Sequence, residues 1–370
     1  MRNQRYGNFL LFSSFAATVF WAASAHSDDT SVIVTGTRLP RAVADEVPSV
    51  DVVTREDIDA RQPRSAVDLL RDIPGVWADQ PGGPGSVSSV YVRGADPNFT
   101  LVLIDGVRVN DSTNSRGGSF DLSALTPDSI ERVEVVRGVR SAAYGSDALA
   151  GVINIITATG ADKPEASIET GFGSDGYHHV NARLLGPLNG ARAALTAGVT
   201  DYGEPSTDHQ LTVRHANAKL EADLRANTKV SVFGRFVDTE AKSYPDESGG
   251  PLFATLRTLE QRESEQISGG FNLEHAFDDD NAIEFRVDAS DRNEVTDSPG
   301  VAPGLRDPFG IPASHYDSEY TTLGAASSLR GRLSEQLRGV VGVEWRQEQG
   351  ESDSVRAFGG FDLPGRFDLQ

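Results

Sequence analysis

The second half of the chain is a series of long segments in which apolar and polar residues roughly alternate. Alternation at every second residue is the period of a β-strand. Several segments run past twelve residues, whereas strands of soluble sheets usually have about 3–10. We therefore predict about nine or ten long antiparallel strands, at residues 166–172, 178–185, 191–202, 210–222, 229–239, 260–277, 282–293, 316–333 and 336–351.

The connections between these segments alternate in length. Gly186–Gly190, Asp278–Asn281 and Leu333–Glu335 are tight, whereas Thr239–Leu259 and Glu294–His315 are long, polar and rich in Gly and Pro. Long loops at one end and tight turns at the other are typical of an outer-membrane β-barrel. A soluble β-sandwich is the alternative for this half taken alone.

The first 25 residues have the pattern of a secretory signal peptide. Arg2 and Arg5 precede the apolar run Phe9–Ala22, and Ala23–Ala25 forms an A-x-A cleavage site. The alternative is a membrane anchor, but the run is shorter than the ~20 residues that a spanning helix needs. We expect the mature chain to begin near His26, outside the cytoplasm.

Composition narrows the class of protein. The chain has no Cys, which excludes a disulfide framework and thiol chemistry. Its net charge is -20, from 54 acidic and 34 basic residues, which argues against a nucleic-acid partner. No run after the signal approaches the ~18 apolar residues of a membrane helix. A barrel stays possible because its strands face lipid at every second residue only.

Residues 46–160 read as a compact α+β domain. Val50–Thr54 is strand-like, and Thr54 with Asp57 nearly forms a capping box for a following helix. Ser65–Ile73 has apolar residues at helical spacing and stops at Pro74. Further strands are predicted at 87–93, 101–104, 130–137 and 152–157.

Four sequence blocks in this domain carry a family resemblance. They are PGV at 74–76, SSVYVRG at 88–94, LVLIDGVRVN at 101–110 and SIERVEVVRGVRSAAYGSDALAGVINIIT at 129–157. Together they closely resemble the plug domain of TonB-dependent outer-membrane receptors, nearest to the vitamin B12 (cobalamin) branch. One departure is Val139, which stands where the family usually has Pro.

The resemblance implies an α+β plug domain followed by an antiparallel transmembrane β-barrel. Residues 165–370 match the family only in style, as the first part of its 22-stranded barrel. The chain ends in mid-pattern at Phe367–Gln370, and a closed barrel needs its last strand to pair with its first. We therefore expect an incomplete barrel, the N-terminal portion of a longer receptor in the bacterial outer membrane.

The segment DTSVIVTGTR, Asp29–Arg38, resembles the TonB box and lies in the expected periplasmic tail, residues 26–45. A β-prone peptide can add a strand to the sheet edge of a partner, here the C-terminal domain of TonB with its inner-membrane energising complex. An ordinary frayed terminus is the alternative. The expected TonB-binding residues are Thr30, Ser31, Val32, Ile33, Val34 and Thr35.

Two plug loops match the positions where the family meets its ligand, Asp79–Ser86 and Asn110–Phe120. Their polar side chains on a Gly-containing backbone suit a large polar nutrient held by many hydrogen bonds, although a merely solvated loop is the alternative. The expected ligand-binding residues are Gln80, Ser86, Asn110, Thr113, Asn114 and Arg116.

Three arginines at strand ends, Arg93, Arg137 and Arg140, are candidates for packing the plug against the barrel. A plug inside a polar lumen places such side chains within reach of inward carboxylates of the wall. Pairing within the plug is the equally weighted alternative.

No catalytic, cofactor or metal site is recognisable. Pro81–Ser86 is Gly-rich but lacks the Lys-Ser/Thr of a P-loop, and no G-x-S-x-G elbow occurs. The acids of 201–208 and 238–247 lack the spacing of a calcium loop, so solvated loop acids are preferred. The resemblance to the receptor family implies TonB-dependent active uptake of a scarce, bulky nutrient of the cobalamin or iron-chelate type. The alternatives are a passive porin-like or structural barrel, or a nonfunctional truncated receptor.

Overall fold

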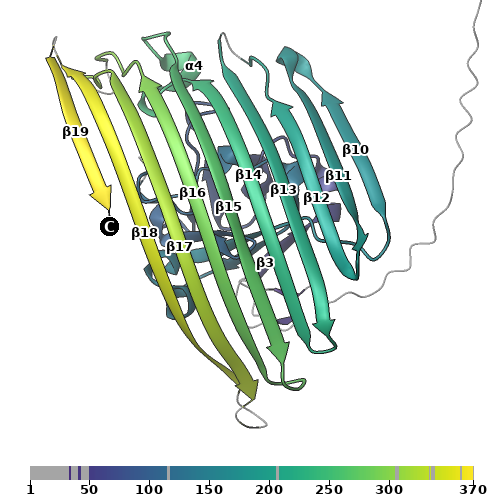
Figure 1. The fold of residues 1–370 in the computed structure, drawn as a ribbon. Coiled ribbons are helices and arrows are strands. Elements are labelled where there is room, and N and C mark those ends of the chain that lie inside the picture. The colour runs from purple at the N-terminus through teal and green to yellow at the C-terminus, as the bar shows by residue number, and fades with distance from the viewer. Residues whose placement is uncertain are drawn as a thin grey trace, which may run out of the picture.

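The computed structural model describes residues 33–34, 41–42 and 50–369, apart from 115–116, 206–207, 305–307, 333, 335–337 and 359–360. Residues 50–157 form an α+β unit, called the plug below. Residues 165–369 form one large antiparallel structure, called the sheet. Figure 1 shows the plug lying against one face of the curved sheet. The expected fold, an α+β plug followed by an incomplete barrel, is confirmed.

The plug contains a five-stranded mixed sheet with the order β3-β8-β9-β6-β7, in which β6 and β9 are parallel neighbours, and a separate hairpin of β4 and β5. Its strands are β3 (Val50–Thr54), β4 (Val76–Asp79), β5 (Ser89–Val92), β6 (Thr100–Ile104), β7 (Val107–Arg108), β8 (Ile130–Arg137) and β9 (Gly151–Thr157). Its helices are α1 (Arg55–Arg61), α2 (Ala66–Arg71) and α3 (Ser141–Tyr144), with 3-10 turns η2 (Pro97–Phe99), η3 (Leu122–Ala124), η4 (Pro127–Ser129) and η5 (Ser146–Ala148).

Helix α1 begins at the predicted cap. The Asp57 backbone N–H donates to Thr54 Oγ1 at 3.3 Å, and the Thr54 backbone N–H donates to Asp57 Oδ2 at 2.9 Å. This reciprocal pair satisfies N–H groups that a helix start leaves unpaired. The Thr54 N–H and then its hydroxyl lower the pKa of Asp57.

The plug core lies between α2 and the five-stranded sheet. Leu69, Leu70, Val92, Val102 and Ile153 are each at most 2% exposed and belong to one apolar cluster. All seven residues of β9 are buried, as expected for a strand with neighbours on both sides. This packing holds the loops at the ends of the plug strands in fixed positions.

The sheet has ten strands in chain order, and each pairs antiparallel with the next. The predicted number, about nine or ten, is confirmed. The strands are β10 (Glu165–Phe172), β11 (His178–Leu188), β12 (Ala191–Asp201), β13 (Gln210–Arg225), β14 (Thr228–Ser243), β15 (Glu260–Ala276), β16 (Ala282–Ser298), β17 (Ser314–Arg332), β18 (Arg338–Phe358) and β19 (Phe361–Leu369).

The connections alternate as predicted. Long ones follow β14, at 244–259, and β16, at 299–313. The first contains η7 (Asp246–Ser248) and α4 (Gly250–Phe253), which Figure 1 shows at the end opposite the tight turns. The prediction of a turn at Gly186–Gly190 is wrong in part, because residues 186–188 still pair with β12 and only 189–190 turn.

The two faces of the sheet differ in polarity. On β14, Arg235 and Thr239 point to the plug side and are 4% and 2% exposed. Val232 and Phe236 point to the other face and are 47% and 37% exposed. Polar residues inside and apolar residues outside are the arrangement of a barrel wall in lipid. Among the described residues, no helix is both long and apolar enough to cross a membrane.

Of the predicted TonB box, only Ile33 and Val34 are described. They form β1 (Ile33–Val34), which pairs antiparallel with β2 (Arg41–Ala42). Thr30, Ser31, Val32 and Thr35 lie outside the described residues, as does the predicted signal peptide. TonB binding by this segment stays a prediction.

Candidate functional site

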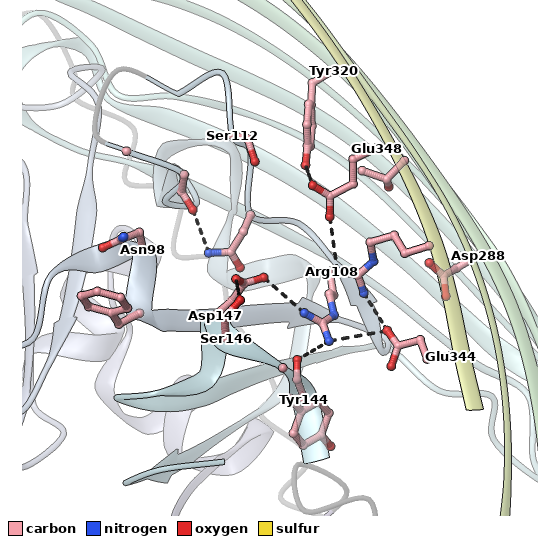
Figure 2. Close-up of a pocket in the computed structure, with 17 residues that line it drawn as sticks. Asn98, Arg108, Ser112, Tyr144, Ser146, Asp147, Asp288, Tyr320, Glu344 and Glu348 are labelled. Atoms are coloured by element: carbon pink, nitrogen blue, oxygen red, sulfur yellow. Dashed lines mark hydrogen bonds and ion pairs between the residues drawn. The ribbon is translucent and has the colours of Figure 1, made fainter. Parts of the chain in front are cut away.

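A cavity of about 720 Å³, called the outer cavity, lies between the plug and strands β16–β18. Figure 2 shows its side chains converging from the plug on one side and the sheet on the other. The plug contributes residues near η2, β7, the 110–118 loop and the segment 144–147. The sheet contributes Asp288, Tyr320, Thr322, Glu344, Arg346 and Glu348.

Arg108 links the plug to the sheet at this cavity. Its Nη1 lies 3.2 Å from Asp147 Oδ2, and its Nη2 donates to the carbonyl oxygen of Tyr144. The same Nη2 lies 3.5 Å from Glu344 Oε1 on β18. The guanidinium is planar and has five donors, which lets one side chain hold three groups at once.

The network continues along the sheet. Arg346 Nη2 lies 2.8 Å from Glu344 Oε1, and its Nη1 lies 3.4 Å from Glu348 Oε1. The Tyr320 hydroxyl donates to Glu348 Oε2 at 2.9 Å. The cavity is therefore lined by alternating charges, with two arginines against the four carboxylates of Asp147, Asp288, Glu344 and Glu348. This lining accommodates polar ligands that are neutral or cationic better than polyanions.

The predicted ligand-binding residues are not brought together in one cavity. Asn110 lines the outer cavity, whereas Gln80 lines a separate cavity of about 270 Å³ near α2 and the β10–β11 loop. Thr113 and Asn114 line neither, and both bond to Asp111 within their own loop. Arg116 lies outside the described residues.

Two of these residues hold their own loops. Ser86 is 2% exposed; its hydroxyl donates to the Gly83 carbonyl at 3.0 Å and accepts from the Gly82 N–H at 3.1 Å. Asn110 Oδ1 accepts from the Val102 N–H at 2.7 Å, and its Nδ2 donates to the carbonyls of Thr100 and Gly118. Their side chains position the backbone of the loops that face the cavities.

Replacing Asn110 by alanine is expected to cost about 2 kcal/mol of unfolding free energy, because it leaves a buried backbone N–H without an acceptor. Hydrogen exchange of β6 and the 110–118 loop measures the loss. Thr113→Ala is the matched control and should cost less, since Thr113 is only partly buried. An Asn110→Ala variant of unchanged stability contradicts this role.

Of the three arginines predicted to pack the plug against the barrel, Arg137 has its partners inside the plug. Arg137 Nη1 lies 2.5 Å from Asp51 Oδ2 and also donates to the Pro74 carbonyl. For Arg137 the equally weighted alternative, pairing within the plug, is therefore the one observed, and the pairing with barrel carboxylates is not. The backbone N–H groups of Arg93 and Arg140 donate within the plug, to Gly75 and Ala148, and the role of these two side chains stays a prediction.

Most ion pairs that do cross the interface between plug and sheet have their charges reversed relative to the prediction of plug arginines paired with barrel carboxylates. Carboxylates come from the plug and cations come from the sheet, with Arg108–Glu344 as an exception. The reason is that the plug loops facing the sheet carry Asp and Glu, whereas Arg137 lies beside β3. The crossing pairs are Asp105–Lys219 at 2.8 Å, Asp121–Arg262 at 2.7 Å, Asp111–Arg292 and Glu131–Arg183.

Asp121 and Arg262 form the most buried of these crossing pairs. The side chains of Asp121 and Arg262 are 5% and 4% exposed. Asp121 also accepts from Ser88 and Ser123, through the backbone N–H and the hydroxyl of each. Burial alone would raise the pKa of Asp121, but the Arg262 guanidinium and these hydrogen bonds outweigh it and hold the pKa at about 2.

Sequence reasoning missed Arg108, Tyr144 and the acidic residues of β18. One signal was present, because Glu344, Arg346 and Glu348 occur at every second position and therefore share one face of a strand. Nothing local indicated that Arg108 would meet this face, since 236 residues separate it from Glu344.

Comparisons with known proteins agree with this geometry. Residues 43–152 match the family model of the TonB-dependent receptor plug domain. The chain is 35% identical over 240 residues to a vitamin B12 transporter of Photobacterium profundum. This alignment covers 62% of this chain and 39% of that protein.

Two solved structures have the same fold. The ferripyoverdine receptor of Pseudomonas aeruginosa matches with a TM-score of 0.71 and 20% identity, over 91% of this chain and 48% of that one. The ferric preacinetobactin receptor of Acinetobacter baumannii matches with a TM-score of 0.71 and 14% identity, over 90% and 52%. This chain thus spans about half the length of the receptors it resembles.

Proposed function

We propose that this chain is a TonB-dependent receptor of the outer membrane and that it takes part in the active uptake of a scarce, bulky nutrient of the cobalamin or iron-chelate type. The plug match at residues 43–152 carries this proposal. A passive barrel has no need of such a domain. We assign no chemical step to the chain, and the transported molecule leaves unchanged.

We favour cobalamin over an iron chelate. The sequence similarity of 35% is to a vitamin B12 transporter, whereas the likeness to siderophore receptors is one of fold. The outer cavity adds a physical reason, because its lining has more carboxylates than arginines. An anionic chelate meets repulsion in such a lining, whereas a neutral ligand rich in amides finds both donors and acceptors.

The tail and the plug have separate roles in this proposal. Residues 26–45 form a periplasmic tail in which Thr30–Thr35 pair with TonB as an added strand. In the structure Ile33 and Val34 pair with Ala42 and Arg41 over two residues only. A partner strand that offers more backbone hydrogen bonds can displace this short pairing. Ligand binding shifts the population in which the tail is available, and energy from the inner-membrane proton gradient drives rearrangement of the plug.

The first contacts with the nutrient belong to the loops at the outward end. Gln80, Thr113 and Asn114 offer polar side chains there, and Arg116, which lies outside the described residues, is proposed with them from the sequence alone. The 244–259 connection approaches the 79–86 loop, where a Cβ on Gly82 would meet the Tyr244 carbonyl. Ser86 and Asn110 act by shaping the loops. The 110–118 loop lines the outer cavity, and we propose that the nutrient enters the cavity past this loop.

Uptake of labelled cobalamin and of a labelled ferric siderophore by cells with and without the gene tests this function. We expect cobalamin uptake to require the gene and to stop when a protonophore collapses the proton gradient. Uptake that continues without the gradient indicates a passive pore. Gene-dependent uptake of the siderophore alone overturns the ligand assignment but not the transport.

A further inference from the structure

A second cavity, called the inner cavity, lies between the plug and strands β13–β17 of the sheet. Its volume is about 350 Å³, and it is lined by plug residues such as Asp105 and Asn154 and by strands β13–β17. Its lining is polar and balanced, with four carboxylates and four basic side chains. It lies toward the tight-turn end of the strands, which is the periplasmic end of an outer-membrane barrel.

The two cavities lie end to end along the same face of the sheet. On β17, Tyr320 and Thr322 line the outer cavity, and Ala326, Ser328 and Arg330 line the inner one. These positions are all even, so their side chains share one face of the strand. On β16, Asp288 lines the outer cavity, and Glu284 and Arg286 line the inner one, in the same order.

A narrow neck separates the cavities at Gly324. This residue is the Cα partner of Asp288, and a Cβ on it would lie 2.6 Å from Asp288 Oδ2. Arg286 Nε lies 3.4 Å from Asp288 Oδ1. Arg286 also reaches the plug, because a Cβ on Gly106 would lie 2.8 Å from Arg286 Nη1. The sheet therefore closes its side of the neck with Arg286 and Asp288, and plug residues close the other side.

Tyr144 is the plug residue that lines both cavities. Its side chain is buried, 5% exposed, in a small apolar cluster with Leu101, Leu103 and Val152 of the plug. Tyr144 therefore stands between the two cavities, with its ring anchored in the plug.

The segment that carries Tyr144 is short. Backbone N–H groups of Tyr144, Gly145 and Ala148 donate to the carbonyls of Arg140, Ser141 and Gly145, and Arg108 adds side-chain bonds to the same segment. Arg108 binds the Tyr144 carbonyl at one end of the segment and Asp147 at the other, and it reaches Glu344 of the sheet, as Figure 2 shows. Between them, Gly145 has φ 84 and ψ -170, a conformation essentially open to glycine alone. The geometry gives the segment a natural hinge.

From these observations we propose that Tyr144 is a gate between the outer and inner cavities and that Arg108 holds it closed. Movement of the 144–147 segment joins the cavities into one polar passage along β16 and β17. This inference rests on the proposed uptake function, for which it names the route and the residues that control it.

Cysteine labelling on intact cells tests the gate, and the chain has no Cys of its own. Ser328→Cys places a thiol in the inner cavity, and Thr322→Cys places one in the outer cavity. The probe is a maleimide on a polyethylene glycol chain too large for general porins. We expect Thr322→Cys to react and Ser328→Cys to be protected. Adding Arg108→Gln should speed labelling at Ser328→Cys about tenfold or more, because hydrogen bonds to charged groups shift an equilibrium by that much.

Arg366→Gln is the matched control. Arg366 pairs with Glu351 and Asp368 away from both cavities, so its loss should leave labelling at Ser328→Cys unchanged. Asp147→Asn is the second test variant, for use if Arg108→Gln fails to fold. It removes the charge of one partly exposed partner of Arg108. It should also increase labelling.

Two outcomes overturn the gate. Fast labelling of Ser328→Cys in the otherwise unchanged protein means that the cavities already communicate. Continued protection in both the Arg108→Gln and Asp147→Asn backgrounds, with Thr322→Cys still reactive, means that Arg108 holds no gate. The assay needs neither nutrient nor TonB, so its result is separate from failure of the uptake proposal.

Discussion

Replacing Asp121 by alanine is expected to weaken the association of the plug with the sheet by about 3 to 5 kcal/mol of free energy, the largest stability effect that we predict for a single side chain. Asp121 and Arg262 are both almost fully buried at the interface of plug and sheet. Removing the carboxylate leaves the guanidinium in place without a counter-charge, and the cost of burying an unpaired charge dominates.

Hydrogen exchange of β8 and β9, measured on the detergent-solubilised protein, reports this loss. Asp59→Ala is the matched control, because Asp59 pairs with Arg55 at the surface and is 60% exposed. Its loss should cost no more than about 1 kcal/mol. Equal exchange rates in the two variants would rule out a special role for the Asp121–Arg262 pair.

The same pair predicts a pH dependence. The folded pKa of Asp121, about 2, is depressed from an unfolded value near 3.9. A depressed carboxyl pKa adds stability that is fully present above the unfolded pKa and is lost as pH falls through the folded one. We therefore expect the contribution of Asp121 to fade between about pH 4 and pH 2. The free energy of unfolding of an Asp121→Asn variant should change less with pH in this window than that of the parent, as denaturant titrations at several pH values would show.

Deletion of residues 29–36 is expected to abolish uptake while ligand binding to the cell surface persists. The segment is proposed to pair with TonB through main-chain hydrogen bonds. Uptake of labelled cobalamin should fall to the level of cells without TonB. Binding in the cold, before transport, should equal that of the parent.

A pair of point variants separates strand pairing from side-chain recognition. Ile33→Pro removes a backbone N–H and fixes φ, so it should block strand addition and uptake. Ile33→Val keeps both the backbone and the β propensity, so it should transport normally. Normal uptake by the Ile33→Pro variant, or by the deletion, would refute pairing at this segment.

Much of the fold was predictable because its signals are local. The long alternating segments predicted the positions of nine of the ten strands, all but β19, and Thr54 with Asp57 predicted the start of α1. The error at Gly186–Leu188 has a physical cause. Strand β10 begins at Glu165, opposite Leu185, so Pro187 has a paired strand on one side only, where a missing N–H is tolerated.

The candidate site was much harder to predict, since it forms between distant parts of the chain. Asn110 looked like a ligand contact from its polarity, but its amide is used by the backbone of its own loop. Arg137 looked like an interface residue from its strand-end position, and Asp51 of the neighbouring strand pairs with it instead. Only the packing of plug on sheet decides which charges meet.

The position of β3 determines how mechanical force would enter the plug. The tail leads into Val50, and β3 is an edge strand whose sheet neighbour is β8 alone. Tension on the tail therefore loads the bonds of Val50 with Val136 first and peels one edge, a few bonds at a time. The ion pairs with the sheet lie farther along the chain. A moderate force can therefore unfold the N-terminal part of the plug while the remainder stays bound to the sheet.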